Sequence, residues 1–305
     1  MTLVSDVRYS LSASSGPEQP ELELSLPAGM HYGGSVPPAL QPQPVNLVRS
    51  SRTPSDPSDV RWTSGFSYMP SEIGNLDILD DCGPDSSSVG YQKAVKIPDW
   101  HPYVLSAEFQ CSMMGFDEAV YQQRVRDLLD VATPKMVEYE FWSGKLAKLT
   151  GWPNLYLEQA SGADVYTASS IQEAVGICEM YIGAMGPGAR GMIHASPFLT
   201  PYLQLVVRRE GNLLLTQRDT IVVPGAGYGD YATGSAPPQP AGPFKMFATG
   251  MTDCRLGQIV PVPDNDSFYQ AIDRKTNSVV VKAERYACAS WDGYVFARVD
   301  LTLPA

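Results

Sequence analysis

His194 and Ser196 have the types and spacing that could support catalysis. They are two positions apart, so in an extended segment both side chains point to the same face. With an acid such as Asp164 they would provide the nucleophile, base and orienting carboxylate of a hydrolase. However, the chain has only three histidines and no G-x-S-x-G turn to present a serine nucleophile. We therefore favour a structural histidine, with a cytosolic Ser/His hydrolase as a remote alternative.

Two glycine-rich segments could bind phosphate groups. Gly186, Gly188 and Gly191 match the G-x-G-x-x-G pattern of dinucleotide-binding proteins. That pattern binds a pyrophosphate where it lies between a strand and the start of a helix. Here a predicted helix precedes the glycines and a predicted strand follows them, so the order is wrong for this function. The glycines of residues 225–229 are predicted to form a mobile surface turn, and no cofactor is expected.

Candidate metal ligands do not have the spacing of known metal sites. Asp77, Asp80 and Asp81 lack the regular oxygen-ligand spacing of a calcium loop, which indicates a solvated acidic turn. No H-E-x-x-H helix brings two histidines together. The five cysteines include no C-x-x-C pair, which argues against a zinc ribbon or a disulfide framework. Neither a metal site nor an enzymatic activity is predicted.

Composition excludes other classes of function. A chain of 305 residues with 44% hydrophobic residues can bury a large core. Only 18% of the residues are charged, which fits a protein whose surface is largely covered by neighbours. The net charge of −11 repels phosphate backbones, so a primary DNA-binding role is not expected. No apolar stretch is long enough for a transmembrane helix, and no secretion signal is recognisable.

Residues 116–142 have the pattern of one long helix around which the chain is organised. Apolar side chains, including Val120 and Leu128, recur at helical spacing, and polar side chains including Glu138 are predicted to occupy the opposite side. Ser143 and Gly144 follow the last periodic residue and predict the end of the helix. Pro134 removes one backbone donor, so we expect it to kink or split the helix.

An arm precedes this helix, and shorter elements flank it. Residues 1–60 are rich in proline and serine, which predicts an extended arm, and we expect no removed N-terminal segment before it. Residues 103–111 alternate as a strand. Ser169 or Ser170 is placed to cap a second helix over residues 171–185, which has Glu173 in its first turn. Strand-like segments dominate after residue 201, and we predict turns at residues 211–212, 273–277 and 291–293.

The order of these features resembles the major capsid proteins of tailed phages. The resemblance covers most of residues 61–303 and is most specific at Glu138–Gly144, Arg190–Pro197, Val222–Gly229 and Ala283–Asp292. The chain is similar in particular to Hong Kong 97-type proteins of siphophages that infect actinobacteria. The resemblance implies an α+β capsid fold with an N-terminal arm, an E-loop, a long spine helix, a peripheral domain and an axial domain.

The resemblance also implies domain boundaries. The arm would comprise residues 1–60. The peripheral domain would comprise residues 61–168 and 272–305, with the E-loop at about residues 69–99 and the spine helix at residues 116–142. The axial domain would comprise residues 169–271. Residues 77–81 and 228–242 would then be interaction surfaces.

The implied function is that of a major capsid protein. Copies would self-assemble as pentamers and hexamers into an icosahedral head shell that encloses packaged double-stranded DNA, with assembly in the host cytoplasm. Scaffold, portal and decoration proteins would be further partners, DNA would be contacted only non-specifically, and no membrane would be involved. The alternative is an encapsulin-like cellular nanocompartment. Encapsulins carry an N-terminal helix that docks cargo, and residues 1–59 contain no amphipathic helix of that kind, which favours the phage protein.

Some relatives link their subunits covalently through an E-loop lysine and an asparagine on a neighbouring subunit. Lys93 and Lys96 are the lysines of the predicted E-loop, and Asn277 lies in the C-terminal strand region. The reaction needs a lysine that burial keeps neutral. Solvated lysines and a turn asparagine are the simpler interpretation, so the cross-link is a secondary hypothesis.

Overall fold

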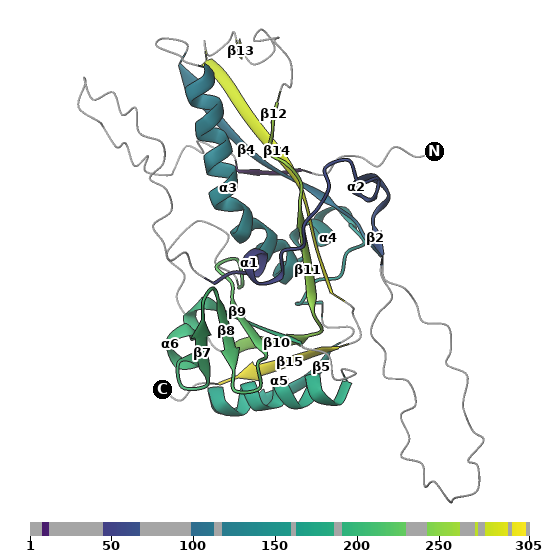
Figure 1. Cartoon of the computed structure of the whole chain (residues 1–305), viewed down its shortest axis with the longest axis vertical. Helices are drawn as coiled ribbons and strands as arrows, with labels where there is room; N and C mark the ends of the chain where they lie inside the picture. The colour runs from purple at the N-terminus through teal and green to yellow at the C-terminus, as the bar shows by residue number, and fades with distance from the viewer. Residues whose placement is uncertain are drawn as a thin grey trace, which may run out of the picture. The chain divides into compact units, whose positions relative to one another are not determined.

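The computed structural model describes residues 8–11, 45–67, 99–112, 118–159, 163–185, 191–229, 243–262, 272–273, 278–291 and 295–302 (Figure 1). They fall into two compact units. The first draws on the described parts of residues 1–43, 103–133 and 256–287, and the second on those of residues 44–102, 134–255 and 288–305. Helix α3 and strand β14 contribute residues to both units.

The first unit is built on a long antiparallel pair of strands. β4 (Tyr103–Ser112) pairs with β14 (Ser278–Trp291) from Tyr103 opposite Ala287 to Ser112 opposite Ser278. The strand predicted over residues 103–111 is thus confirmed. β1 (Arg8–Leu11) adds in parallel to β4, while β12 (Val260–Val262) and β13 (Ile272–Asp273) pair with β14.

The first half of α3 lies against this pair of strands. α3 comprises Glu118–Ser143, and in this half it buries Val125 and Leu129 completely. Tyr121 stacks on Phe109 of β4 with ring centroids 5.6 Å apart. The spacing of the buried residues therefore matches the helical period used for the prediction.

The second unit contains a mixed sheet. Its described strands follow the order β5-β15-β10-β6-β9-β8-β7. Their bounds are β5 Asp164–Ala168, β15 Phe296–Leu301, β10 Phe244–Thr249, β6 Met192–Ala195, β9 Ile221–Pro224, β8 Leu213–Thr216 and β7 Val207–Glu210. β7 and β8 pair antiparallel around the turn predicted at residues 211–212, where Gly211 has φ 59°.

One face of this sheet is covered by α5 (Ile171–Met185), which matches the second predicted helix. The Oγ of Ser170 accepts a hydrogen bond from the Glu173 N–H at 3.2 Å, and Glu173 Oε2 accepts from the Ser169 N–H at 2.8 Å. The Ser170 hydroxyl therefore caps the first turn of the helix, and Glu173 holds the residue before the cap. The short helices η2 (Pro197–Leu199) and α6 (Thr200–Leu203) add buried leucines to the same core.

The other face carries an aromatic core around the end of α3. Trp142 packs on Tyr228 and Phe247, with ring centroids 4.9 and 4.8 Å apart. Phe141 packs on Trp291 at 4.9 Å, and Trp291 packs on Trp100 at 4.7 Å. The remaining described elements of this unit are α1 Leu47–Ser51, α2 Arg61–Ser64, β2 Phe66–Ser67, β3 Asp99–Trp100, α4 Lys145–Thr150 and β11 Thr252–Leu256.

Three expectations about local structure are wrong. α3 continues through Pro134 as one helix, so the split that we considered as an alternative to a kink does not occur. Val120 and Leu128 are exposed and Glu138 is fully buried, so these three residues were assigned to the wrong side of the helix. The hairpin predicted at residues 291–293 is not formed, because the described strands on its two sides, β14 and β15, belong to different sheets.

The turn predicted at residues 273–277 connects strands that do pair. Ile272 of β13 lies opposite Val279 of β14, and Asp273 lies opposite Ser278. Residues 274–277 themselves lie outside the described residues. No described helix has the length and apolar content needed to cross a membrane.

Candidate functional site: a glycine turn and two buried glutamates on the long helix

His194 is a structural residue of the sheet. Its side chain is fully buried on β6. One ring nitrogen lies 2.9 Å from the Tyr228 hydroxyl and the other lies 2.9 Å from the Thr249 hydroxyl. Burial lowers the pKa of His194 to about 3, so the ring is neutral at physiological pH. Both nitrogens are engaged, which leaves neither to activate a nucleophile.

The other members of the hypothetical hydrolase triad serve different structural purposes. Ser196 accepts a hydrogen bond from the Phe198 N–H and caps η2. Asp164 is exposed on the edge strand β5, and its side chain forms a hydrogen bond with Tyr181. Burial, and to a smaller extent this hydrogen bond, raise the pKa of Tyr181 to about 12. The structure therefore supports the interpretation of His194 as structural.

Several predicted sites fall outside the described residues. They are Asp77, Asp80, Asp81, Lys93, Lys96, Asn277, residues 69–98 of the predicted E-loop, residues 186–190 and residues 230–242. Gly191 is described, and a Cβ there would lie 2.7 Å from the Thr249 carbonyl oxygen, so packing explains this glycine. Within the described part of the chain, no group of three or more His, Cys, Asp and Glu residues could hold a metal.

The glycine turn of residues 225–229 is docked on α3, and the prediction of a mobile surface turn is wrong at this position. Gly225, Gly227 and Tyr228 are all buried. A Cβ on Gly227 would lie 2.3 Å from the Lys135 carbonyl oxygen and 2.6 Å from the Tyr139 amide nitrogen. Such distances are too short for any side chain, so only glycine lets the turn approach the helix backbone this closely.

Glu138 joins three segments that are distant in the sequence. Its Oε1 accepts a hydrogen bond from the Leu47 N–H at 2.8 Å, at the start of α1. Its Oε2 accepts one from the Gly227 N–H at 3.0 Å, and the Ala226 backbone also hydrogen-bonds to the carboxylate. Burial raises the pKa of Glu138 to about 7, and these amide bonds counteract the rise only in part.

Glu140 makes a similar connection to the next helix. Its Oε2 accepts a hydrogen bond from the Leu146 N–H at 2.9 Å, and the Ala147 backbone also hydrogen-bonds to it. The side chain satisfies donors at the start of α4, whose preceding residue, Gly144, offers no side chain to cap it. Burial raises the pKa of Glu140 to about 7.

Through these contacts, the end of α3 holds three other segments of the second unit in place. α1, the 225–229 turn and α4 are all held by carboxylates on one short stretch of helix, Glu138–Glu140. This arrangement positions backbone segments and presents no reactive group to solvent. Sequence reasoning placed Glu138 on the polar face and missed both roles. The available signal was the alternation of glutamates with aromatic residues in VEYEFW, which is atypical of a solvated face.

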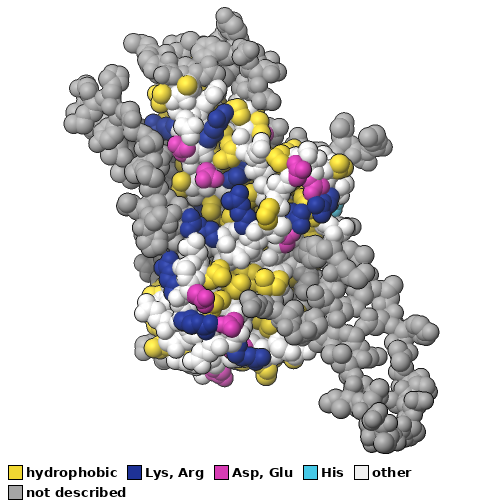
Figure 2. Space-filling view, in the orientation of Figure 1, with side chains coloured by type: hydrophobic (Ala, Val, Ile, Leu, Met, Phe, Trp, Pro, Cys, Tyr) yellow, Lys and Arg dark blue, Asp and Glu magenta, His cyan; other side chains and the backbone are white. Residues whose placement is uncertain are grey.

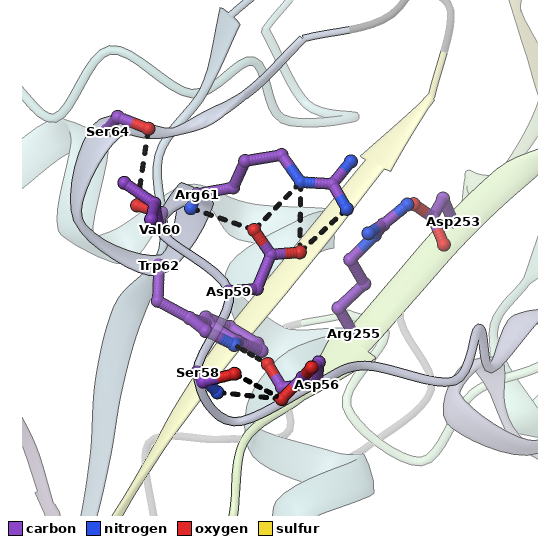
Figure 3. A network of polar contacts seen from close by, with 9 residues as sticks. All are labelled: Asp56, Ser58, Asp59, Val60, Arg61, Trp62, Ser64, Asp253 and Arg255. Atoms are coloured by element: carbon purple, nitrogen blue, oxygen red, sulfur yellow. Dashed lines mark hydrogen bonds and ion pairs between the residues drawn. The ribbon is translucent and has the colours of Figure 1, made fainter.

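Asp59, Arg61 and Arg255 belong to a charged cluster (Figure 3), and both arginines lie over the Phe66 ring of β2. The undescribed residues of the predicted E-loop lie in the sequence between β2 and β3. Arg61 donates two hydrogen bonds to Asp59 Oδ2, at 2.9 and 2.6 Å, and these bonds contribute to lowering the pKa of Asp59 to about 2. Arg255 lies over the Phe66 ring, 4.7 Å from its centroid. The cluster therefore braces the β2–β3 pair, which anchors both ends of that segment.

The described surface exposes apolar side chains between charged ones (Figure 2). The large ones are Val60, Val120, Leu128, Val131, Leu149, Leu155, Val165, Met180, Tyr202, Leu205, Met251, Val260 and Tyr286. Single exposed apolar residues are ordinary in a monomer, so their exposure alone does not define an interface.

Comparisons with known proteins support the fold. No protein-family model matches the sequence, and no curated protein matches it significantly. A chain of the holo-SrpI encapsulin complex from Synechococcus elongatus PCC 7942 matches with a TM-score of 0.51 and 9% identity, covering 88% of this chain and 90% of that chain. The α+β Hong Kong 97-type capsid fold is therefore confirmed.

Solved structures from phages of actinobacteria are also similar to this chain. A chain from Gordonia phage Cozz matches with a TM-score of 0.48 and 11% identity, covering 83% of this chain and 84% of that chain. A chain from Mycobacterium phage Ogopogo matches with a TM-score of 0.44 and 11% identity, covering 88% and 96% respectively.

Proposed function

We propose that this chain is the subunit of a self-assembling shell, and specifically the major capsid protein of a tailed phage whose head encloses double-stranded DNA. The observation that carries the proposal is that the fold of an encapsulin-complex chain matches over 88% of this chain and 90% of the other. The low share of charged residues, 18%, is consistent with a surface covered by neighbouring copies. We propose no enzymatic role.

Two segments that the second unit holds at one or both ends suggest how such a subunit would contact its neighbours. The β2–β3 pair holds both ends of residues 68–98, and Glu138 holds α1, which follows residues 12–44. We propose that these segments belong to the predicted E-loop, at about residues 69–99, and to the predicted arm, residues 1–60, and that both contact neighbouring copies in pentamers and hexamers. A closed shell repeats each contact in every subunit, so modest contacts add up to a stable particle.

The assignment of residues 61–168 and 272–305 to a peripheral domain, and of residues 169–271 to an axial domain, stays a prediction. So do a virion location, assembly in the host cytoplasm, and the participation of scaffold, portal and decoration proteins. DNA contacts would be non-specific because the chain has a net charge of −11.

The encapsulin-like nanocompartment is the second candidate, because the SrpI complex has the same fold. The content of purified particles separates the two functions. Nuclease-resistant double-stranded DNA inside particles purified from lysed host cells would support the phage capsid protein. Particles that hold a protein cargo and no protected DNA would support the nanocompartment.

The primary test is the assembly state of the purified full-length chain. We expect megadalton rings or shells in size-exclusion chromatography and negative-stain microscopy. A stable 33.2 kDa monomer at high protein concentration, with no rings, would contradict the proposal. Boiled particles on a denaturing gel test the cross-link between Lys93 or Lys96 and Asn277, because a clean monomer band excludes a covalent bond.

A further inference from the structure

The sheet of the second unit ends in two short strands of similar length. β5 has five residues and β7 has four, and they are labelled on opposite sides of this sheet in Figure 1. Among the described residues, no strand pairs with the outer side of either one. Such an edge presents unpaired backbone N–H and C=O groups, which can pair with a strand of another chain.

The two edge strands run in the same direction. β5 is parallel to β15, β15 is antiparallel to β10, and β10 is antiparallel to β6. β6 is parallel to β9, and two antiparallel pairings then lead through β8 to β7. A second copy placed head to tail, with the strand direction kept, would therefore bring its β7 alongside β5 in parallel. The α5-covered faces of the two sheets would lie on the same side.

The two edges carry opposite charges on this α5-covered face. Asp164 is two positions before Tyr166, whose ring contacts Tyr181 of α5 with centroids 6.2 Å apart. Arg209 is two positions after Val207, which packs against the core beneath α5. Because alternate residues of a strand share a face, Asp164 and Arg209 both lie on the α5 side. Both side chains are exposed.

The charges favour one of the three ways in which these edges could pair. Two β7 edges would bring two Arg209 side chains near each other, whereas two antiparallel β5 edges would place Asp164 opposite Ala168 and leave its charge unpaired. Only β5 against β7 places unlike charges together, and like charges across an interface are disfavoured. This contact joins two different surfaces of the same subunit, and such a heterologous contact generates a ring when the rotation closes.

Exposed apolar side chains lie beside both edges. Val165 on β5 is 54% exposed, and Leu205, two residues before β7, is 74% exposed. An edge-to-edge contact would remove part of this apolar surface from water. The contact would thus combine backbone pairing, apolar burial and charge complementarity.

We propose that β5 of one copy pairs with β7 of the next copy within the rings of the shell, with Asp164 opposite Val207 and diagonally across from Arg209 of the neighbouring copy. This inference rests on the proposed shell function and names one surface through which the subunits meet. The partner is a second copy of this chain.

Charge reversal of the full-length chain tests the pairing. Arg209→Asp is the primary variant, because the only contact shown for the Arg209 side chain is the Nε bond to the Gly211 carbonyl, and the fold should tolerate the change. We expect this variant and Asp164→Lys each to lower the yield of rings and shells about fivefold or more. The double variant, which restores unlike charges in the opposite order, should recover most of the yield. Arg218→Asp, the same change in the exposed turn between β8 and β9, is the matched control and should assemble like the wild type.

The possible outcomes separate the two proposals. If the wild type forms no rings or shells, the proposed function fails, and the edge contact fails with it. If the wild type assembles and Arg209→Asp assembles equally well, the edge contact is wrong while the shell function stands. Failure of the double variant to recover, with each chain shown to be folded by its melting curve, also overturns the edge contact.

Discussion

The two halves of α3 differ in which side chains they bury. In the first half, Val120 is 56% exposed and Val131 is 60% exposed. In the second half, Glu138 and Glu140 are buried among aromatic residues. The same helix therefore exposes apolar groups at one end and buries carboxylates at the other. The spacing of apolar residues shows which side chains share a face of the helix. Whether that face is buried depends on which other segments of the chain pack against it.

The two halves also stabilise buried charge by different means. Beside the first half, the buried Arg285 donates to Asp130 Oδ1 at 3.0 Å and to the Gly257 carbonyl oxygen at 3.1 Å. In the second half, backbone amides donate to the glutamates. Asp130 is 71% exposed, so solvent weakens its ion pair, whereas the amide bonds are shielded from water. We expect the second half to be the less tolerant of substitution.

The largest effect is expected at the turn that docks on the second half. Gly227→Ala places a methyl group 2.3 Å from the Lys135 carbonyl oxygen, which backbone packing cannot accommodate. We expect a loss of about 3 kcal/mol or more in the free energy of unfolding, measured by urea denaturation. Gly176→Ala is the control, because no atom lies within 4 Å of its new Cβ in α5, and it should stabilise the chain by about 0.5–1 kcal/mol. Equal effects at both glycines would show that the turn is not docked tightly.

The buried glutamates should make stability depend on pH. Burial raises the pKa of Glu138 to about 7 from the ordinary 4.5, so the folded state binds a proton more tightly than the unfolded state does. Its contribution is fully present below pH 4.5 and is lost as the pH rises through 7. A shift of this size corresponds to roughly 3 kcal/mol at most for one carboxyl group. The urea midpoint of the wild type should therefore be lower at pH 8 than at pH 5.

Glu138→Gln tests this assignment, because glutamine has the shape of the protonated acid and cannot ionise. We expect the variant to be less stable than the wild type at pH 5, because its side-chain NH2 group must face one of the backbone N–H donors that the carboxylate accepts from. Its stability should nevertheless change less than that of the wild type between pH 5 and pH 8. Glu140→Gln should act similarly, since burial also raises the pKa of Glu140 to about 7. Glu210→Gln, at a solvent-exposed carboxyl, is the matched control. An unchanged pH dependence in the Glu138 and Glu140 double variant would contradict the prediction.

A smaller effect is expected from valines on opposite sides of Pro134. Val137 is fully buried, and Val137→Ala should cost about 2 kcal/mol because it removes two methyl groups from a packed core. Val131→Ala should cost less than about 0.5 kcal/mol in the unassembled chain, because the side chain already contacts water. Thermal denaturation of both variants measures the difference. Similar melting temperatures would mean that the two halves of α3 are equally buried.

The smallest effect is expected at the exposed end of the ion pair in the first half. Asp130→Asn keeps the shape of the side chain and removes the charge that faces Arg285. Because Asp130 is largely exposed, we expect a loss below about 1 kcal/mol that decreases further at high salt. A loss as large as that of Gly227→Ala would show that this pair is shielded from solvent and would remove the contrast between the two halves.

The predictable part of the fold is its local structure. The long helix, the helix over residues 171–185 with its serine cap, and the strand over residues 103–111 follow from spacing and capping residues, which act within a few positions along the chain. The resemblance of short motifs such as Glu138–Gly144 then implied the capsid fold. The docking of Gly227 was missed because the helix backbone that it approaches is about ninety residues away in the sequence.

The amino-acid sequence alone was thus enough to predict the helices and strands from their periods, the serine cap of the second helix and the absence of recognisable catalytic spacing. These features depend on residues that are close together in the sequence. The tertiary structure decided that Glu138 is buried, that α3 continues through Pro134, and that β14 and β15 join different sheets. Those outcomes depend on which distant backbone donors and side chains surround each position. No local pattern encodes that environment, because a carboxylate is stable in a core only where folding brings amide donors to it.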